Sequence, residues 1–110
     1  MTGVQTCALP ILSSETVGKA YAAADDLARE VLQETVELLT VWLGNMVDLL
    51  DPDVLVMGGG VAAMLQPFFG DIKRELPKWT INPHTAKIPL LMANYGAESG
   101  IAGGAALCPE

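Results

Sequence analysis

A helical period dominates the first half of the chain. Apolar residues recur at spacings of three and four over residues 26–50, which is typical of a helix with one apolar face. Asp25 or Asp26 is suited to cap this helix, and Pro52 is expected to end it. In its last two turns apolar residues surround the axis, so we expect burial on several sides. Asn45 falls in this stretch, and we expect it to tether a neighbouring loop because a buried amide needs hydrogen-bond partners.

A shorter helix is predicted before the long one and a strand after it. Ser13 or Ser14 can cap a helix that runs to about Ala24. Residues 54–57 form an unbroken apolar run, Val-Leu-Val-Met, which is typical of a central strand covered by helices on both faces. The glycines at 58–60 end that strand.

The second half of the chain predicts a further helix, a second strand and a closing helix. Residues 61–76 are helical in character, with Pro67 in the first turn of a second segment. Residues 77–83 are predicted to form a loop, residues 87–93 a second apolar strand, and residues 96–107 a helix rich in small residues. The order α–α–β–α–β–α indicates a mixed α/β layer with strands flanked by helices.

The first eleven residues, MTGVQTCALPI, show neither helical nor strand periodicity. The string closely resembles the translation of a common short-read sequencing adapter. We therefore expect residues 1–11 to be non-native, and residues 12–110 to be the carboxy-terminal part of a longer protein truncated upstream of Leu12. A genuine apolar amino-terminal arm is the alternative, and uninterrupted genomic sequence upstream of codon 12 would decide between the two.

Composition narrows the classes of function. An apolar content of 51% with 17% charged residues excludes a disordered tail, and a net charge of −7 argues against binding to nucleic acid or anionic membranes. No apolar stretch is long enough to span a bilayer, so we expect a cytoplasmic domain. Cys7 and Cys108 lie at opposite ends and form neither a disulfide framework nor a zinc site. We interpret Trp42 and Trp79 as packing residues.

The strongest candidate for binding chemistry is the run Gly58-Gly59-Gly60, followed by Val61. A buried strand would deliver these glycines to the carboxyl edge of a sheet, where open α/β sheets bind ligands. Glycine lets a nucleotide approach the backbone and permits positive φ. The alternative is that the glycines only form a tight turn between strand and helix. Neither a dinucleotide fingerprint nor a P-loop matches, because Ala63 stands where the fingerprint needs glycine and no Gly-Lys-Ser/Thr follows.

Other chemistry-bearing residues have structural interpretations. Small residues along 96–107 predict a flat helix face for close packing, and the alternative is a helix N-terminus near a ligand with Asn94 or Glu98 as the polar contact. His84 lies in a predicted loop without a second residue at metal-ligand spacing. No carboxylate is placed as an obvious general base.

Together these segments resemble the carboxy-terminal end of the ROK family, which comprises sugar kinases of the glucokinase, fructokinase and N-acetylmannosamine kinase type and related transcriptional repressors. The resemblance covers Val17 to Leu107. It departs from the family at Ala24, where glycine usually precedes the aspartate, and in the short stretch between Gly60 and Pro67. The segments that carry it are AAADDLA at 22–28, GNMVDLLDPD at 44–53, VLVMGGGV at 54–61 and ANYGAESGIAGGAA at 93–106.

The resemblance implies part of one lobe of an actin-like, ribonuclease-H-like ATPase fold. It implies a cytoplasmic, homo-oligomeric, glucokinase-like enzyme that transfers the γ-phosphoryl group of ATP to a hexose hydroxyl with Mg²⁺. In the family the triple glycine lies beside the adenosine of ATP, which assigns Gly58, Gly59 and Gly60, with Val61 adjacent, to nucleotide binding. The family's catalytic aspartate, phosphate loop, sugar-binding residues and zinc motif lie upstream of this chain. We therefore assign no catalytic or metal-binding residue and expect the chain alone to be inactive.

Two other functions stay open at this point. The effector domain of a ROK repressor would carry a winged helix-turn-helix upstream. A free-standing nucleotide-binding module would need a start codon near Leu12 and a core that closes by itself. The sequence does not choose the sugar.

Overall fold

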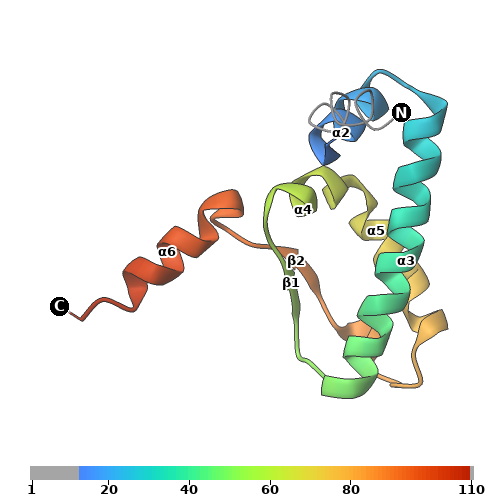
Figure 1. Ribbon diagram of the computed structural model, residues 1–110. Helices are drawn as coiled ribbons and strands as arrows, with labels where there is room; N and C mark the ends of the chain where they lie inside the picture. The colour runs from blue at the N-terminus through green and yellow to red at the C-terminus, as the bar shows by residue number, and fades with distance from the viewer. Residues whose placement is uncertain (1–12, 110) are drawn as a thin grey trace, which may run out of the picture. The chain divides into compact units, whose positions relative to one another are not determined.

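The computed structural model of the chain describes residues 13–109, so the hypothesis about residues 1–11, Cys7 included, lies outside the described residues. The chain divides into two compact units, one ending at Thr35 and the other beginning at Val36. In chain order the helices and strands are α2 (Ser14–Ala22), α3 (Asp26–Leu50), β1 (Leu55–Met57), α4 (Gly60–Leu65), α5 (Phe69–Glu75), β2 (Leu90–Met92) and α6 (Ser99–Ala106) (Figure 1).

The first unit contains α2 and the start of α3, and both helices begin at the predicted capping residues. The Ser13 hydroxyl accepts a hydrogen bond from the backbone N–H of Thr16, which completes a capping box with the Thr16 side chain. The Asp25 carboxylate accepts a hydrogen bond from the N–H of Ala28 at 2.8 Å and so caps α3. Between the two helices Ala24 adopts a left-handed conformation with φ of +62°.

The left-handed conformation of Ala24 has an energetic cost. A side chain with a Cβ atom is strained at positive φ, whereas glycine is not. The turn between α2 and α3 requires this left-handed conformation from Ala24.

The second unit contains the end of α3, the two strands and the remaining helices. β1 and β2 pair in parallel, with Leu55 opposite Leu90 and Met57 opposite Met92. Their inward side chains pack on a core supplied mainly by α3 and α5. The buried members of that core are Leu43, Val47, Ile72, Leu76 and Ile88.

The predicted order of elements is only partly right. The helical stretch expected over 61–76 is divided near Pro67, as predicted, into α4 and α5, which a 3₁₀ turn at Gln66–Phe68 joins. Pro67 lies in the first positions of that turn, where its missing N–H interrupts the α-helical hydrogen bonds. Part of the loop expected over 77–83 belongs to a 3₁₀ turn at Leu76–Trp79. The second strand is shorter than 87–93, because Thr85–Lys87 form another 3₁₀ turn.

The expectation that helices cover both faces of the first strand is wrong for the described residues. Val56 of β1 is 59% exposed and its neighbour Leu91 of β2 is 51% exposed, while Leu55 and Met57 pack on the core. The second face would need another apolar layer, and α6, the last helix described, buries none of its residues.

The loop after α5 is held by the carboxylates of Asp48, in α3, and Asp51, just after α3, and not by Asn45, which is exposed. The Asp48 carboxylate accepts hydrogen bonds from the backbone N–H groups of Ile81 and Asn82. The amide of Asn82 donates to Asp51 at 2.6 Å. Because Gly44 packs against the backbone of Trp79, Asp48, four residues further along α3, faces the same loop. Asn45 is rotated about 100° from that face, which is why the expectation failed.

None of the helices described in the chain combines the length and the apolarity that a membrane-spanning helix requires.

Candidate functional site

The two segments that sequence analysis singled out meet at the carboxyl edge of the strand pair. β1 ends at Met57 and leads into the triple glycine, and β2 ends at Met92 and leads into residues 93–96. Because the strands are parallel, both segments leave the sheet at the same edge. The N–H of Ala93 donates to the carbonyl of Met57 at 2.8 Å, which joins the two segments directly.

The first glycine of the run has a packing role. A Cβ atom on Gly58 would lie 3.2 Å from the Cβ of Ala93 and 4.0 Å from the hydroxyl oxygen of Ser99. The first distance is shorter than an ordinary contact between carbon atoms. Gly58 therefore allows the ends of the two strands to approach closely.

The next two glycines leave their backbone open. Gly59 has φ of +95° and ψ of 172°, a region that only glycine enters without strain. Apart from the adjacent residues and the backbone of the same helix, no described atom lies within 4 Å of a Cβ placed on Gly59 or Gly60. Val61, in the first turn of α4, is 47% exposed. The turn therefore needs glycine at Gly59 for its conformation, and it presents bare backbone at the sheet edge, so the two interpretations of the glycines are compatible.

The segment after β2 is ordered by a second left-handed glycine. Gly96 has φ of +53°, its N–H donates to the carbonyl of Ala93 at 3.2 Å, and its carbonyl accepts from the Ser99 hydroxyl at 2.8 Å. Asn94 and Glu98, the two candidate polar contacts, are both exposed.

The small residues of α6 find no packing partner in the described chain. A Cβ atom on Gly100, Gly103 or Gly104 would meet no described atom within 4 Å apart from the adjacent residues and the backbone of α6. The flat helix face expected from the sequence is present, but the surface that would pack against it is not among the described residues.

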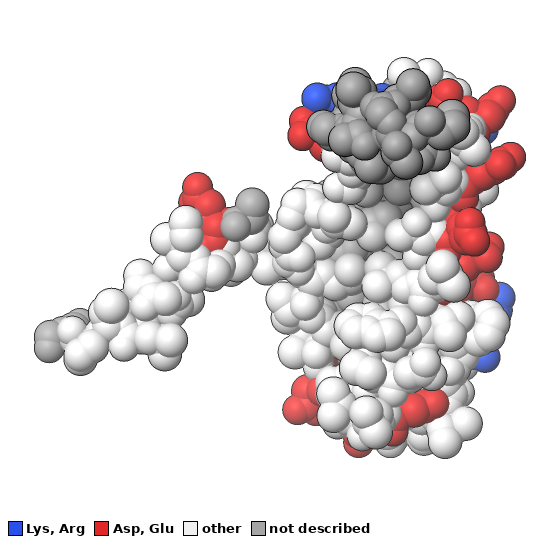
Figure 2. Space-filling model, in the orientation of Figure 1, with Lys and Arg blue, Asp and Glu red and all other residues white. Residues whose placement is uncertain are grey.

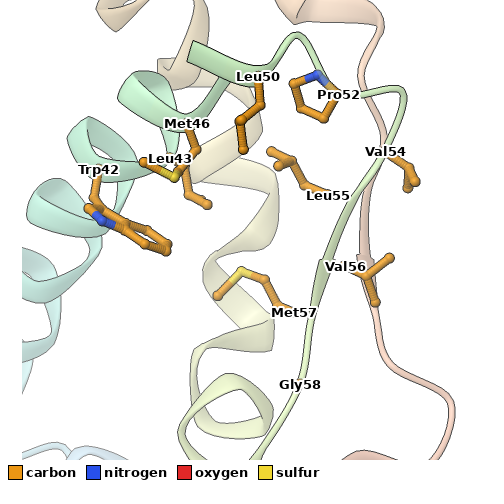
Figure 3. Close-up of a pocket in the computed structure, with 10 residues that line it drawn as sticks. All are labelled: Trp42, Leu43, Met46, Leu50, Pro52, Val54, Leu55, Val56, Met57 and Gly58. Atoms are coloured by element: carbon orange, nitrogen blue, oxygen red, sulfur yellow. The ribbon is translucent and has the colours of Figure 1, made fainter. Parts of the chain in front are cut away.

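An apolar groove of about 510 Å³ lies between α3 and β1 and extends to Gly58 (Figure 3). Leu55 and Met57 point from the strand toward α3, whereas Val54 and Val56 point away from it. Trp42 contributes to the wall although its side chain is 56% exposed. Such a lining suits apolar groups. The lining residues are Trp42, Leu43, Met46, Leu50, Pro52, Val54, Leu55, Val56, Met57 and Gly58.

A second groove, of about 390 Å³, is acidic and lies between α3 and α5. Its carboxylates Asp71 and Glu75 pair with Arg74 and Lys78, respectively at 2.8 Å and 2.6 Å. The hydrogen bond from Lys78 is the main cause that lowers the pKa of Glu75, and the hydrogen bond to Asp71 raises the pKa of Arg74. Trp79 at the rim is 55% exposed, so both tryptophans pack on only part of their surface.

The described residues contain no group of three histidine, cysteine, aspartate or glutamate side chains that could hold a metal ion. His84 is exposed in its loop, as expected, and Cys108 is an exposed free thiol. Among the residues that the structure describes, the candidate site is thus a backbone surface rather than a catalytic centre.

Comparison with known proteins identifies what this arrangement is similar to. The sequence profile of the ROK family matches residues 6–110. The chain is 34% identical over 97 residues to the N-acetyl-D-glucosamine kinase of Mannheimia succiniciproducens, a match that covers 87% of this chain and 31% of that protein. The N-acetyl-D-glucosamine kinase of Pasteurella multocida is 31% identical, in a match that covers 87% of this chain and 31% of that protein. That of Vibrio vulnificus is 32% identical, in a match that covers 81% of this chain and 29% of that protein. The chain thus spans about a third of the length of these relatives.

Proposed function

Because the chain belongs to the ROK family, we propose that it is the nucleotide-side segment of an ATP-dependent sugar kinase, with Gly59, Gly60 and Val61 beside the adenosine of ATP. The observation that carries this proposal is the open backbone at Gly59, whose φ is +95° at the carboxyl edge of β1. Gly58 belongs to the same turn and supports it through its close approach to Ala93.

The architecture is compatible with part of an actin-like lobe. Two adjacent parallel strands, a long helix before them and helices between and after them are elements that such a lobe requires. The triple glycine follows the first of these strands, at the edge where ligands bind in open α/β sheets.

For the whole protein we propose transfer of the γ-phosphoryl group of ATP to a hexose hydroxyl, with Mg²⁺ neutralising charge on the phosphates. The relatives carry the name N-acetyl-D-glucosamine kinase, which makes a 2-acetamido hexose the first sugar to test and glucose the second. The same names favour a kinase over the repressor that the sequence left open. Phosphoryl transfer depends on positioned phosphates and a positioned nucleophile, and we assign neither task to the described residues.

Gly60 offers a sharper test of nucleotide contact than Gly59. A side chain at Gly59 would strain the backbone, whereas Gly60 has no positive φ and open space around it. The experiment uses a chimeric kinase in which this chain replaces the matched 97 residues of the Mannheimia enzyme. Gly60→Val is compared with Gly70→Val, because Gly70 lies in α5, away from the strand edge, and is equally open.

We expect Gly60→Val to raise the KM for ATP about tenfold while the KM for the sugar stays within twofold, since a lost contact common to ground and transition states appears in KM. Gly70→Val should change neither constant. Gly59→Val should raise the KM for ATP as well, together with a loss of stability. The proposed contact would be contradicted if Gly60→Val raised both KM values equally, or if it left the KM for ATP unchanged.

A further inference from the structure

The most exposed aromatic side chain in the described part of the chain lies at the same edge of the strand pair as the open glycines. Tyr95 is 67% exposed, compared with 56% for Trp42 and 55% for Trp79. It is the third residue after β2, which ends at Met92. Because tyrosine combines an apolar ring face with a polar hydroxyl, a ring in this place is available to a ligand bound at the edge.

The turn that carries Tyr95 is held by hydrogen bonds on both sides. The N–H of Gly96 donates to the carbonyl of Ala93 at 3.2 Å, and the carbonyl of Tyr95 accepts from the N–H of Glu98 at 3.0 Å. The Ser99 hydroxyl donates to the carbonyl of Gly96 at 2.8 Å. The backbone that carries the tyrosine ring is therefore fixed before a ligand arrives, which lowers the entropy cost of binding.

Tyr95 and the open glycines both lie close to the contact between Gly58 and Ala93. Tyr95 is two residues beyond Ala93, and Gly60 is two residues beyond Gly58. Because consecutive Cα atoms are about 3.8 Å apart, each lies at most about 8 Å from its member of that contact. Helix α4, which begins at Gly60, also contacts the 3₁₀ turn at Gly96–Glu98. The tyrosine and the bare backbone therefore border one small region of the surface.

The segments that form this region carry no charge. Residues 54–63 and 90–97 contain no Asp, Glu, Lys or Arg, and Glu98 is the first charged residue after β2. In Figure 2 the surface over β1 and α4 is white, whereas red carboxylates gather along α3. Because phosphate groups are normally paired with Arg or Lys, this surface suits the neutral base of a nucleotide better than its phosphates.

We propose that the ring of Tyr95 stacks on the base of the bound nucleotide and makes the kinase prefer purine over pyrimidine nucleoside triphosphates. This inference rests on the proposed function, because that function places a nucleotide at the glycines. Every base has a π-face that can stack on an aromatic ring, and the attraction grows with the number of atoms in contact. A purine has two rings and a pyrimidine one. Tyr95 therefore favours purines without distinguishing adenine from guanine.

Two substitutions in the chimeric kinase defined above separate stacking from ordinary apolar contact. Tyr95→Leu keeps an apolar side chain and removes the aromatic ring, so it should raise the KM for ATP about tenfold while the KM for the sugar stays within about twofold. Tyr95→Phe keeps the ring and should leave the KM for ATP within about twofold of its original value. The proposal would be overturned if Tyr95→Leu left the KM for ATP unchanged, or if Tyr95→Phe raised it as much as Tyr95→Leu.

The choice of nucleotide gives a readout that a purely structural role of Tyr95 would not change. The chimera with the original tyrosine should use ATP better than CTP. Tyr95→Leu should reduce the ratio of the two kcat/KM values about fivefold, because the purine loses more stacking contact than the pyrimidine. An equal loss of kcat/KM for ATP and for CTP would overturn the proposal.

A photoreactive nucleotide tests the same contact without turnover, so it also applies to a chimera that is inactive. The probe is 8-azido-ATP, which carries its reactive group on the base. It should label the peptide that follows Lys87 at residues 93–96, and an excess of ATP should suppress this labelling. Label found only elsewhere in the chimera would overturn the proposal.

The variants at Tyr95 and Gly60 distinguish failure of this inference from failure of the proposed function. Gly60→Val reports on the nucleotide contact of the glycines, and Tyr95→Leu reports on stacking. If only Gly60→Val raises the KM for ATP, the stacking is overturned and the proposed function stands. If neither variant raises it, both proposals are overturned.

Discussion

Gly58 and Ala93 lie so close together that a Cβ atom on Gly58 would stand 3.2 Å from the Cβ of Ala93. The two residues follow the last residues of β1 and β2, and the Ala93 N–H is bonded to the carbonyl of Met57. The contact therefore brings the triple glycine and the segment leading to α6 to one edge of the strand pair. The first glycine of a run assigned to nucleotide binding thus also has a structural task.

The Gly58–Ala93 contact predicts a compensating pair of substitutions. Gly58→Ala in the chimeric kinase should destabilise it by about 1 kcal/mol, because an added methyl group overpacks the site. Ala93→Gly should recover a large part of that loss when combined with Gly58→Ala, although it costs stability by itself. Urea unfolding of the two single variants and the double variant measures the coupling. If the changes in unfolding free energy of the two single variants simply add up in the double variant, the two positions do not compete for space.

The conformation of Ala24 predicts that one substitution to glycine stabilises the protein. At φ of +62°, Ala24→Gly removes a strain of about 1 kcal/mol and should raise the unfolding free energy of the chimeric kinase by up to that amount. Ala23→Gly is the matched control, because Ala23 has φ of −85° and gains nothing from glycine. If urea unfolding gave the Ala23→Gly variant an unfolding free energy equal to or above that of the Ala24→Gly variant, Ala24 would not be strained.

The hydrogen bonds of Asp48 predict which α3 side chain holds the following loop. Asp48→Ala removes the acceptor for the N–H groups of Ile81 and Asn82, so the amide of Ile81 should exchange about tenfold faster or more. Asp48→Asn keeps one acceptor oxygen and should have an intermediate effect. Asn45→Ala, one residue away from the Gly44 face of the helix, should leave the exchange rate unchanged. An Asn45→Ala effect as large as that of Asp48→Ala would restore the original expectation for Asn45.

The exposed apolar surface predicts the behaviour of the chain by itself. Large apolar side chains remain open on the strands, on α3 and on α6, including Val56, Leu49 at 73% exposure and Ile101 at 77%. Patches of this kind are rare on soluble monomers. The chain alone should bind a hydrophobic dye and should be oligomeric, aggregated or molten. A monodisperse monomer with cooperative unfolding and no dye binding would support the free-standing module instead.

The chain alone should also lack sugar kinase activity. We assign no phosphate loop and no catalytic base to the described residues, and a positioned nucleophile is indispensable for phosphoryl transfer. A coupled assay for ADP with N-acetylglucosamine, mannose or glucose should give no signal above a blank without protein. Clear turnover by contaminant-free protein would mean that a base has been overlooked.

Local sequence determined where α2 and α3 begin, where α3 ends and where the chain turns after β1. The Ser13 and Asp25 caps, the end of α3 before Pro52 and the turn at residues 58–60 depend on side chains or backbone conformations within a few residues. Such local rules can be read from sequence because the groups that satisfy them are neighbours along the chain.

The tertiary structure alone decided which faces are buried and which residues hold the loop. Asn45 and Asp48 are both polar residues in an apolar stretch, and only the contact of Gly44 with Trp79 shows that the face containing Asp48 meets the loop. The apolar run at 54–57 predicted burial on both sides, but one face of the strand pair is open because the described chain supplies a single apolar layer. The period of apolar residues along the chain predicts which face of a helix or strand is apolar. What covers that face depends on residues distant in sequence.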